Sequence, residues 1–447
     1  MIKRNRLILV FVALILIHSG CANKSSERQI QITESSEIQI EEQITESSNY
    51  SAQDKEPIYL NDAYDLISVV EKTHPAFVLD DIRDDYEQEK QEFINSITSE
   101  TTKDEFILLV RKYLTVFQDG HTFVVNDTNK RFLDVNCRAA GKDLFLINED
   151  GSLSKDRITH IGGVPLYQIL ETVQDYHVAE NDAAKDLNNS MWALNDEVLN
   201  LAGCDIDSGF AELTVDQNGT FYKKKISFVS KDIYECYNYT FGITSRKIDN
   251  IYYIDMNICE ENKNLETQIN KLKKALESGV TKIIIDVTNN RGGNSKACTR
   301  LLNAMGMTPP SYGCFIRYSE LAHENRGVPS EGFEKYDPDK TQAKRNEKIN
   351  LVVLTNERTY SSATMIAVFV KDGGLGTIIG TPSSNSPSAY GDILYYQLPV
   401  SKINVAISYK RFLRPDTNAD QRILIPDIVT EYNADILQTA MDYLSKS

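Results

Sequence analysis

The chain has little basic charge, few histidines and no closely paired cysteines, and these shortages exclude several classes of function. Lysine and arginine total 48 against 64 acidic residues, which gives a formal net charge of −16 at pH 7. Nucleic-acid binding needs a basic surface, so we expect no nucleic-acid partner. No two of the seven cysteines have the spacing of a zinc site, and we expect neither a metal nor a cofactor. The cysteine spacing also assigns no disulfide.

The first 20 residues are typical of a secretory signal. A basic segment (residues 3–6) precedes an uninterrupted apolar run (7–17), which is too short to span a bilayer comfortably. Small residues then lead directly to Cys21, as in the bacterial lipoprotein processing box, although His18 stands where that box usually has Leu. We therefore expect lipidation at Cys21 and a membrane-anchored protein on the cell surface. The alternative is an ordinary cleaved signal and a secreted protein, in which Cys21 is incidental.

Residues 21–57 predict a disordered acidic tether behind the anchor. The hexapeptide Gln-Ile-Thr-Glu-Ser-Ser occurs at 31–36 and again at 43–48, and no aromatic residue precedes Tyr50 in this segment. Such a composition buries too little apolar surface to offset its ordering entropy. Residues 58–447 are then long enough for about two or three domains with their own cores.

The first part of the globular region predicts helices and then a β-rich segment. Residues 58 to about 118 look helical and belong to an expected N-terminal subdomain over 58–132, and Thr102 with Glu105 forms a capping-box pattern. The helix before His121 should stop near Gly120, a residue that readily takes the left-handed conformation of a helix end. Residues 133–235 carry shorter patterns, among them a strand, a Gly-Gly turn and a helix start over 157–166.

Residues 236–447 predict an α/β core. Mostly apolar, strand-like segments at 251–256, 283–287 and 351–354 alternate with stretches of helical spacing. Alternation of this kind produces right-handed crossovers and a mostly parallel sheet covered on both faces. The loops at the carboxyl ends of such strands carry the chemistry.

Three segments contain residue types suited to acyl transfer, and each has an ordinary structural interpretation when taken alone. Gly292 and Gly293 follow a buried strand and could aim amide hydrogens into a cleft, or simply form a turn. Ser361 follows another strand and opens a helix, where it could be a nucleophile or only a helix cap. His121 could be a general base or a structural histidine.

Taken together, these segments resemble in order and spacing the C-terminal processing peptidases and the tricorn core. The resemblance rests on Asp119-Gly-His-Thr122, Asn290-Arg-Gly-Gly293, Ser361-Ser-Ala363 with Ile378-Ile-Gly-Thr-Pro382, and a closing Asp420-Gln-Arg-Ile-Leu-Ile-Pro426. It implies a crotonase-like α/β core, a helical N-terminal subdomain that carries the histidine, and an inserted PDZ-like domain. It also implies a serine peptidase that acts on peptides or unfolded proteins.

One departure places the chain in a particular branch of that family. The processing peptidases use a Ser–Lys dyad, but counting 25 residues on from Ser361 leads to Ser386, and no lysine lies between Lys371 and Lys402. The tricorn-like branch instead uses a histidine and a late acidic residue. His121 and Asp420 occupy those positions, with Asp420 standing where the family more often has Glu.

The resemblance implies a full set of roles. Ser361 is the expected nucleophile, His121 the base, and Asp420 the orienting residue, acting directly or through another polar group. The backbone amides of Gly292 or Gly293 and of Ser362 are the expected oxyanion hole.

Two alternatives remain open. Ser362 is the rival nucleophile, although the family spacing to the next glycine motif favours Ser361. The whole chain could instead be a catalytically inactive lipoprotein on a peptidase scaffold that binds peptides or a small ligand, because fold does not fix function. The shorter acidic side chain at Asp420 is the feature that points in that direction.

Overall fold

The computed structural model describes residues 57–125, 129–149, 151–207, 209–232, 242–432 and 434–446. All of them fall within one structural unit, residues 54–447. The predicted signal, Cys21 and nearly the whole tether lie outside the described residues, as does Cys236. The five cysteines within the described ranges are free thiols. Those ranges contain no helix that combines the length and the apolar character needed to cross a membrane.

The C-terminal part of the chain forms a six-stranded sheet of the predicted mostly parallel kind. Its order is β10–β11–β12–β15–β16–β19, in which only β10 and β11 are antiparallel neighbours. The central strands are buried on both faces, as a parallel sheet between two helical layers requires. The strands are β10 (Ile243–Ile248), β11 (Ile251–Met256), β12 (Lys282–Asp286), β15 (Asn350–Thr355), β16 (Thr377–Gly380) and β19 (Ile428–Val429).

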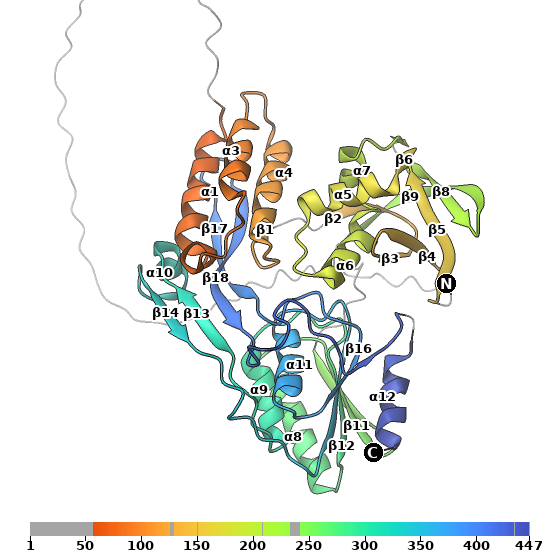
Figure 1. Ribbon diagram of the computed structural model, residues 1–447, viewed down its shortest axis with the longest axis vertical. Coiled ribbons are helices and arrows are strands. Elements are labelled where there is room, and N and C mark those ends of the chain that lie inside the picture. Colours follow the sequence, from red (N-terminus) through yellow and green to blue (C-terminus); the bar gives the residue numbers. More distant parts are fainter. Residues whose placement is uncertain are drawn as a thin grey trace, which may run out of the picture. The chain divides into compact units, whose positions relative to one another are not determined.

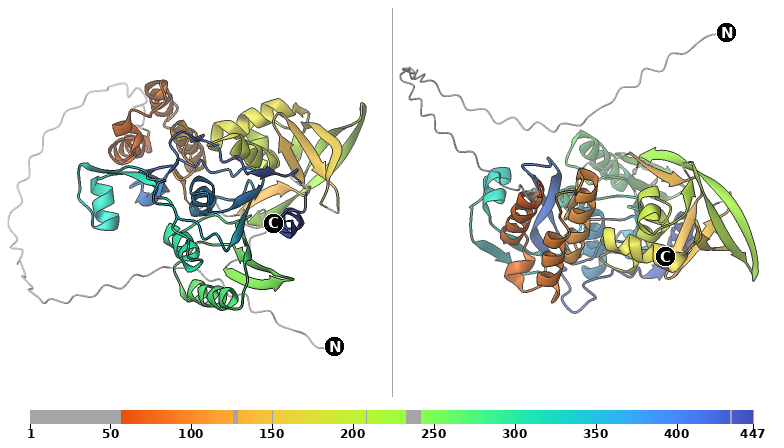
Figure 2. Two further views of the ribbon diagram at one scale, coloured as in Figure 1. Left: turned by 60° about the horizontal axis from the view of Figure 1, so that its bottom comes forward. Right: turned by 90° about the horizontal axis from the view of Figure 1, so that it is seen from above.

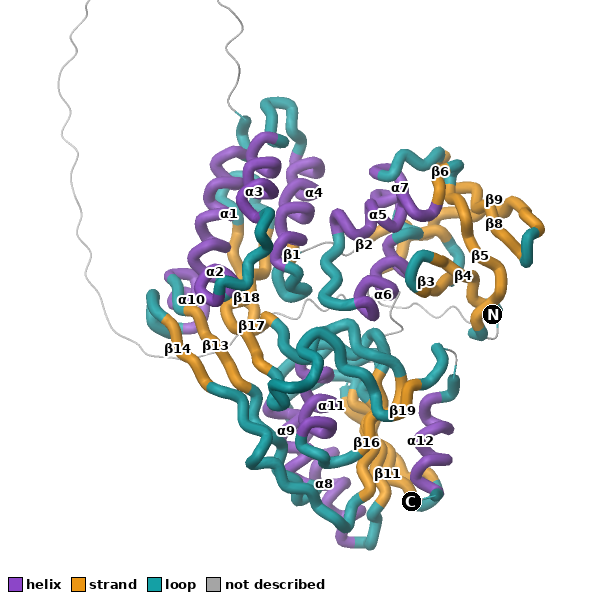
Figure 3. The backbone as a smooth tube through the Cα atoms, in the orientation of Figure 1, coloured by secondary structure: helices purple, strands orange, loops and turns teal. Residues whose placement is uncertain are grey.

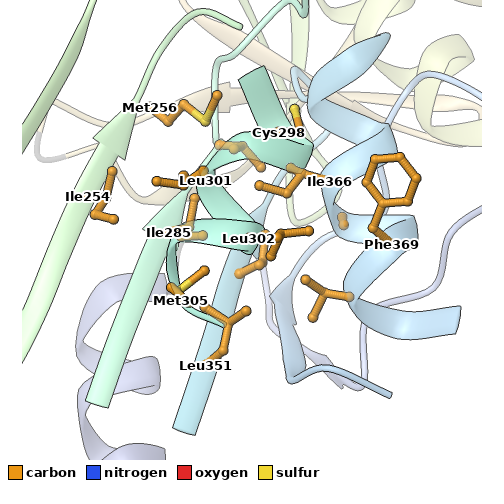
Figure 4. Packing of buried hydrophobic residues seen from close by; sticks show 14 of the residues in the cluster. Ile254, Met256, Ile285, Cys298, Leu301, Leu302, Met305, Leu351, Ile366 and Phe369 are labelled. Carbon is orange, nitrogen blue, oxygen red and sulfur yellow. The ribbon is translucent and has the colours of Figure 1, made fainter. Parts of the chain in front are cut away.

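Helices cover both faces of this sheet (Figure 1). On one face lie α8 (Lys263–Glu277), α9 (Ser295–Ala304) and α11 (Ser362–Asp372), and on the other lies α12 (Ile436–Ser445). Figure 4 shows the first face, where Leu301 of α9, Ile285 of β12 and Ile366 of α11 belong to one fully buried cluster. Burying each such side chain contributes about 1.5–3 kcal/mol. The helix that follows Ser361 is therefore firmly attached to the sheet.

The N-terminal helices pack against a second sheet, whose strands the sequence pattern did not predict. Leu66 and Phe106 of these helices share one buried cluster with Leu394 and Ile407 of the sheet, and two further views show the helices beside it (Figure 2). The helices are α1 (Leu60–Thr73), α2 (Ala76–Leu79), α3 (Tyr86–Asn95) and α4 (Lys103–Leu114). The sheet contains β1 (Phe123–Val124), β13 (Gly313–Arg317), β14 (Phe333–Tyr336), β17 (Tyr390–Gln397) and β18 (Asn404–Leu413), and α10 (Glu320–Arg326) lies between β13 and β14 in the chain.

The helix before His121 begins as predicted but ends differently. Both hydrogen bonds of the Thr102–Glu105 capping box are present. After α4 and a 3₁₀ turn (Thr115–Phe117), the left-handed residue is Gln118, with φ at 47°. Gly120 does not have a positive φ, so its predicted role as a helix end was wrong. It is a glycine because a Cβ there would lie 2.1 Å from the hydroxyl oxygen of Tyr360.

Between these regions the chain forms a third sheet with helices of its own. Its order is β2–β9–β8–β5–β4–β3, with β6 paired to β5 and β7 to β8. The predicted strand, Gly-Gly turn and helix start at 157–166 are confirmed by β5, the turn, β6 and α5. The elements are β2 (Asn129–Leu133), β3 (Cys137–Ala140), β4 (Asp143–Ile147), β5 (Leu153–Ile161), β6 (Val164–Pro165), α5 (Leu166–Tyr176), α6 (Asp182–Trp192), α7 (Asp196–Leu201), β7 (Ile206–Asp207), β8 (Phe210–Gln217) and β9 (Thr220–Asp232). We call this region, residues 129–232, the middle region.

Candidate active site

A cavity of about 350 Å³ is lined by residues of the loops after β12, β15 and β16. Figure 3 shows loop segments gathered at this end of the sheet. The cavity brings His121 and Ser361 to the same space, although 240 residues separate them in the chain. No lysine is among the described residues that line it, in keeping with the missing lysine of the dyad. The other lining residues are Gly293, Asn294, Ser295, Tyr312, Ser362, Thr364, Met365, Asn385, Ser386, Pro387, Ala389, Tyr390, Gly391, Asp392 and Phe412.

Ser361 occupies a strained turn between β15 and α11. Its φ of 53° and ψ of −126° are unusual for a residue with a side chain, and such strain persists only where the surroundings enforce it. Although Ser361 is the N-cap residue of α11, its side chain makes no capping hydrogen bond. Its backbone amide donates instead to Oδ1 of Asn385, at 2.9 Å. The interpretation of Ser361 as a simple helix cap is therefore wrong.

The neighbouring Ser362 has a different environment. It is 4% exposed, and its hydroxyl donates to the carbonyl oxygen of Gly293 at 2.8 Å. No described residue accepts a hydrogen bond from the Ser361 hydroxyl. Of the two serines, only Ser361 thus has a hydroxyl that is free to react.

The three predicted oxyanion donors are not equivalent. The amide of Gly292 donates to Oδ1 of Asn290 at 2.8 Å, so that donor is already used. The amides of Gly293 and Ser362 have no acceptor among the described residues, and both residues line the cavity. Gly293 has a φ of 129°, and a Cβ there would lie 2.2 Å from the carbonyl oxygen of Cys259. Only glycine fits this position, and two amides remain available for an oxyanion.

His121 lies beside a carboxylate that holds its backbone and faces its ring. Asp119 accepts the His121 amide through Oδ1 at 2.8 Å, and the same oxygen lies 3.7 Å from Nδ1 of the ring. That separation is within ion-pair range but longer than a hydrogen bond. The other oxygen of Asp119 accepts from Thr122 at 2.6 Å and contacts His74 at 3.3 Å. Asp119 is therefore fixed on several sides, and the His121 side chain retains 15% exposure toward the cavity.

Charge around His121 changes its proton affinity. Burial on its own would lower the pKa of His121, but Asp119 together with Glu180 and Asp392 outweighs burial and raises that pKa. Burial likewise opposes ionisation of Asp119, yet His121 and His74 bring its pKa well below the usual range. The pair is therefore set to share an imidazolium–carboxylate interaction when His121 takes up a proton.

Glu180 is a member of the site that sequence reasoning missed. It lies between α5 and α6 of the middle region and is 5% exposed. Its carboxylate accepts hydrogen bonds from the loop of His121 and from the loops of Ser361 and Ser386. No motif in the sequence marks a glutamate between two helices of another region as part of this cavity, so only the structure could find it.

Among the described residues, one group of potential metal ligands is close enough together to hold an ion. It consists of Asp119, His121 and Glu180. One ligand atom of each lies within 4.8 Å of the others. The oxygens of both carboxylates, however, already accept hydrogen bonds from protein donors, which a metal ion would have to displace. The group therefore fits a network of carboxylates around a histidine better than it fits a metal.

The structure does not bring Asp420 to the cavity. Its side chain is exposed, and Oδ1 accepts from the backbone amides of Arg422 at 2.8 Å and Ile423 at 3.1 Å. Those two hydrogen bonds lower the pKa of Asp420. Its carbonyl oxygen accepts from Arg414 at 2.6 Å. The acidic groups near His121 are instead Asp119, Glu180 and Asp392.

Comparisons with known proteins concern the family and the fold. Residues 250–430 match the model of peptidase family S41. No curated protein sequence matches the chain. Among solved structures, mature CPAF has a TM-score of 0.60 at 14% identity, with 87% of this chain and 95% of that chain covered. CPAF complexed with lactacystin gives 0.58 at 15% identity, with 87% and 96% covered.

A looser likeness extends to the photosystem II D1 C-terminal processing protease. Its TM-score is 0.44 at 13% identity, with 84% of this chain and 94% of that chain covered. This likeness is too loose to carry an argument. At the identities found for CPAF, the similarity shows a shared fold and leaves the chemistry to the site itself.

Proposed function

Because the chain belongs to peptidase family S41, we propose that it is a serine endopeptidase with Ser361 as nucleophile and His121 as general base. One observation carries the proposal. Ser361 has a strained backbone and an unbonded hydroxyl, in the same cavity as a histidine and two unused backbone amides. Strain of this kind places a serine at the apex of a strand-to-helix turn, as in other serine hydrolases.

The catalytic steps follow from these groups. His121 takes the proton of the Ser361 hydroxyl as the oxygen attacks the scissile carbonyl, and it later gives that proton to the leaving amine. The amides of Gly293 and Ser362 donate to the oxyanion of each tetrahedral intermediate. Water then attacks the acyl-enzyme, again with His121 as base, and releases the new carboxyl terminus.

Asp119 fits the task of orienting His121. Its Oδ1 lies 3.7 Å from Nδ1 of the ring. We therefore assign the hydrogen of the neutral ring to Nδ1, which leaves Nε2 to act as base. Asp420 takes part only at a distance in this proposal. It accepts the amide of Arg422, whose side chain donates to the carbonyl oxygen of Glu180 at 3.1 Å.

The substrates we propose are extracytoplasmic peptides or unfolded proteins. This rests on the signal-like N-terminus and on Cys21 as a lipid anchor, and on a cavity formed by loops rather than by a closed barrel. A PDZ-like role for the middle region would use its edge strand β3, which lies beside α6. The Ala139 amide of β3 already donates to Ser190 of α6 at 2.8 Å, so a peptide would have to displace that helix.

The alternative of an inactive scaffold loses its main support. It depended on the short acidic side chain at Asp420, whereas Asp119 and Glu180 supply carboxylates next to His121.

Hydrolysis of an unfolded protein such as casein tests the proposal. We expect new termini in the mass spectra of the products with the wild-type protein. With Ser361→Ala the rate should fall on the order of 10⁶-fold, to background, as for other serine nucleophiles. The free energy of unfolding should change by less than about 0.5 kcal/mol, because the lost hydroxyl has no partner. Equal cleavage by both proteins would refute the assignment.

A further inference from the structure

We infer that Glu180 of the middle region is a positioning residue of this active site, whose carboxylate holds the Ser361 turn and the His121 loop in one arrangement. The inference rests on the proposed function. The inference adds to the proposed site a residue from outside the α/β core. The middle region thereby becomes a required part of the catalytic apparatus.

The Glu180 carboxylate is fully engaged by donors from three separate places in the chain. Oε1 accepts from the Tyr360 hydroxyl at 2.6 Å and from the Gly120 amide at 3.1 Å. Oε2 accepts from Asn385 Nδ2 and from the Ser386 amide, both at 2.8 Å. Hydrogen bonds to an ionised carboxylate are about twice as strong as those between neutral groups. Four of them make this carboxylate a rigid junction.

Three of these four donors lead directly to the reactive groups. Asn385 donates to Glu180 through Nδ2, and its Oδ1 accepts the amide of Ser361 at 2.9 Å. Glu180 thus fixes which way the Asn385 amide points, and Asn385 in turn holds the strained turn of the nucleophile. Gly120 and Tyr360 each immediately precede a reactive residue in the chain. The ring of Tyr360 also lies 5.0 Å from that of His121, centroid to centroid.

The loop that carries Glu180 is itself attached to the core. Nδ2 of Asn181 donates to the carbonyl oxygens of Ser383 at 3.1 Å and Arg422 at 3.0 Å. The Arg422 side chain donates back to the carbonyl oxygen of Glu180. Three segments that are distant in the chain, around residues 180, 383 and 422, therefore meet at one point. The carboxylate is placed by its own backbone as well as by its partners.

A purely structural role would predict a different pattern of effects. Replacing a buried carboxylate that only stabilised the fold would change the free energy of unfolding. It would not change the rate at which the active site of the folded protein reacts. A positioning residue changes the orientation of the reacting atoms, and a displacement of about 1 Å can cost roughly 100-fold in rate. The two roles are therefore separable by kinetics on the folded protein.

The test measures the second-order rate of Ser361 labelling by a fluorophosphonate on the full chain. Glu180→Gln keeps the size of the side chain but replaces one acceptor oxygen by a donor, so it opposes part of the network. We expect roughly 10- to 100-fold slower labelling for Glu180→Gln. Asn385→Ala should also be slowed, and the double variant should be slowed by less than the product of the two single effects, because the two side chains share the connection through Asn385 Nδ2. Glu171→Gln, an exposed site on α5, is the matched control and should label at the wild-type rate.

The outcomes separate the inference from the proposed function. Absence of labelling in the wild-type protein would refute the proposed function itself. Wild-type labelling with an unchanged rate in Glu180→Gln would refute only the inference. Additive effects in the double variant would also refute it, since Glu180 and Asn385 would then act independently. Thermal unfolding of each variant shows that the labelled protein is folded, and Tyr360→Phe, which removes one donor and leaves Glu180 intact, provides a milder variant should Glu180→Gln not fold.

Discussion

The carboxyl edge of the six-stranded sheet and the α5–α6 loop of the middle region contribute opposite kinds of groups to one cavity. The sheet edge presents the Ser361 hydroxyl and two backbone amides, none with a partner among the described residues. The α5–α6 loop presents Glu180, whose carboxylate accepts four hydrogen bonds. The reactive groups therefore make no hydrogen bonds with the described residues, whereas the carboxylate that positions them has all its acceptor positions occupied.

This difference has an energetic basis. A hydroxyl that faces a cavity can be removed at little cost to folding, whereas breaking a buried, hydrogen-bonded carboxylate leaves unsatisfied partners that each cost about 1–3 kcal/mol. Substitutions at the sheet edge should thus affect activity more than stability, and substitutions among the bonded groups should affect both.

The largest effect among the remaining predictions is at His121. We expect His121→Ala to lower kcat/KM on the order of 10⁶-fold, comparable to loss of the nucleophile, because the two act as a unit.

Wild-type kcat/KM should rise with pH through a midpoint above about 6.5, since the surrounding carboxylates raise the pKa of His121 and the base must be neutral. A pH–rate profile on a peptide substrate measures this midpoint.

Removal of a facing charge should move that midpoint in a defined direction. The charged groups around the ring are Asp119 on its own loop, Glu180 of the middle region and Asp392 of β17. Glu180→Gln removes one negative charge and destabilises the imidazolium, so the midpoint should shift to lower pH. A shift to higher pH, or none, would contradict the described electrostatics.

Ser362→Ala should lower the stability of the protein more than its activity. The substitution leaves the Gly293 carbonyl oxygen without its donor, and we expect a loss of about 1–3 kcal/mol in the free energy of unfolding. Activity should persist, reduced by the disturbed oxyanion loop. Urea unfolding compared with Ser361→Ala provides the measurement. A more stable or wholly inactive Ser362→Ala protein would reverse the roles given to the two serines.

The smallest expected effect concerns the strain at Ser361. Ser361→Gly and Ser361→Ala both lack the hydroxyl, but only glycine adopts a φ of 53° without penalty. We expect the glycine variant to be the more stable of the two by about 1 kcal/mol. Thermal unfolding of the two inactive proteins tests this, and greater stability of the alanine variant would show that the turn is not strained.

Much of the core was predictable from local sequence. Strand Ile251–Met256 and the helix after Ser361 follow from the alternation of mostly apolar strand segments with helical stretches, a pattern that depends on neighbours in the chain. The Gly-Gly positions were predictable as well, because a positive φ leaves few choices of residue. Of the two, only Gly293 has an unused amide, a distinction that depends on the side chain of Asn290.

The parts that could not be predicted depend on contacts between distant segments. The hairpin of β17 and β18 pairs through β18 with β1 and β13. No hydrophobic periodicity within these segments predicts that sheet. Glu180 joins the cavity through a loop whose sequence has no catalytic pattern. Asp420 follows the family position, but the turn around it uses its carboxylate to bind backbone amides, and sequence spacing carries no information about that.

The most direct test of the account is to identify which residue carries the adduct after fluorophosphonate labelling of the folded protein. Peptide mapping by mass spectrometry distinguishes Ser361 from Ser362. We predict a single adduct on Ser361, formed at a rate that falls to background in His121→Ala. An adduct on Ser362, or none in the folded wild-type protein, would contradict the assignment of Ser361 as the unbonded nucleophile of this site.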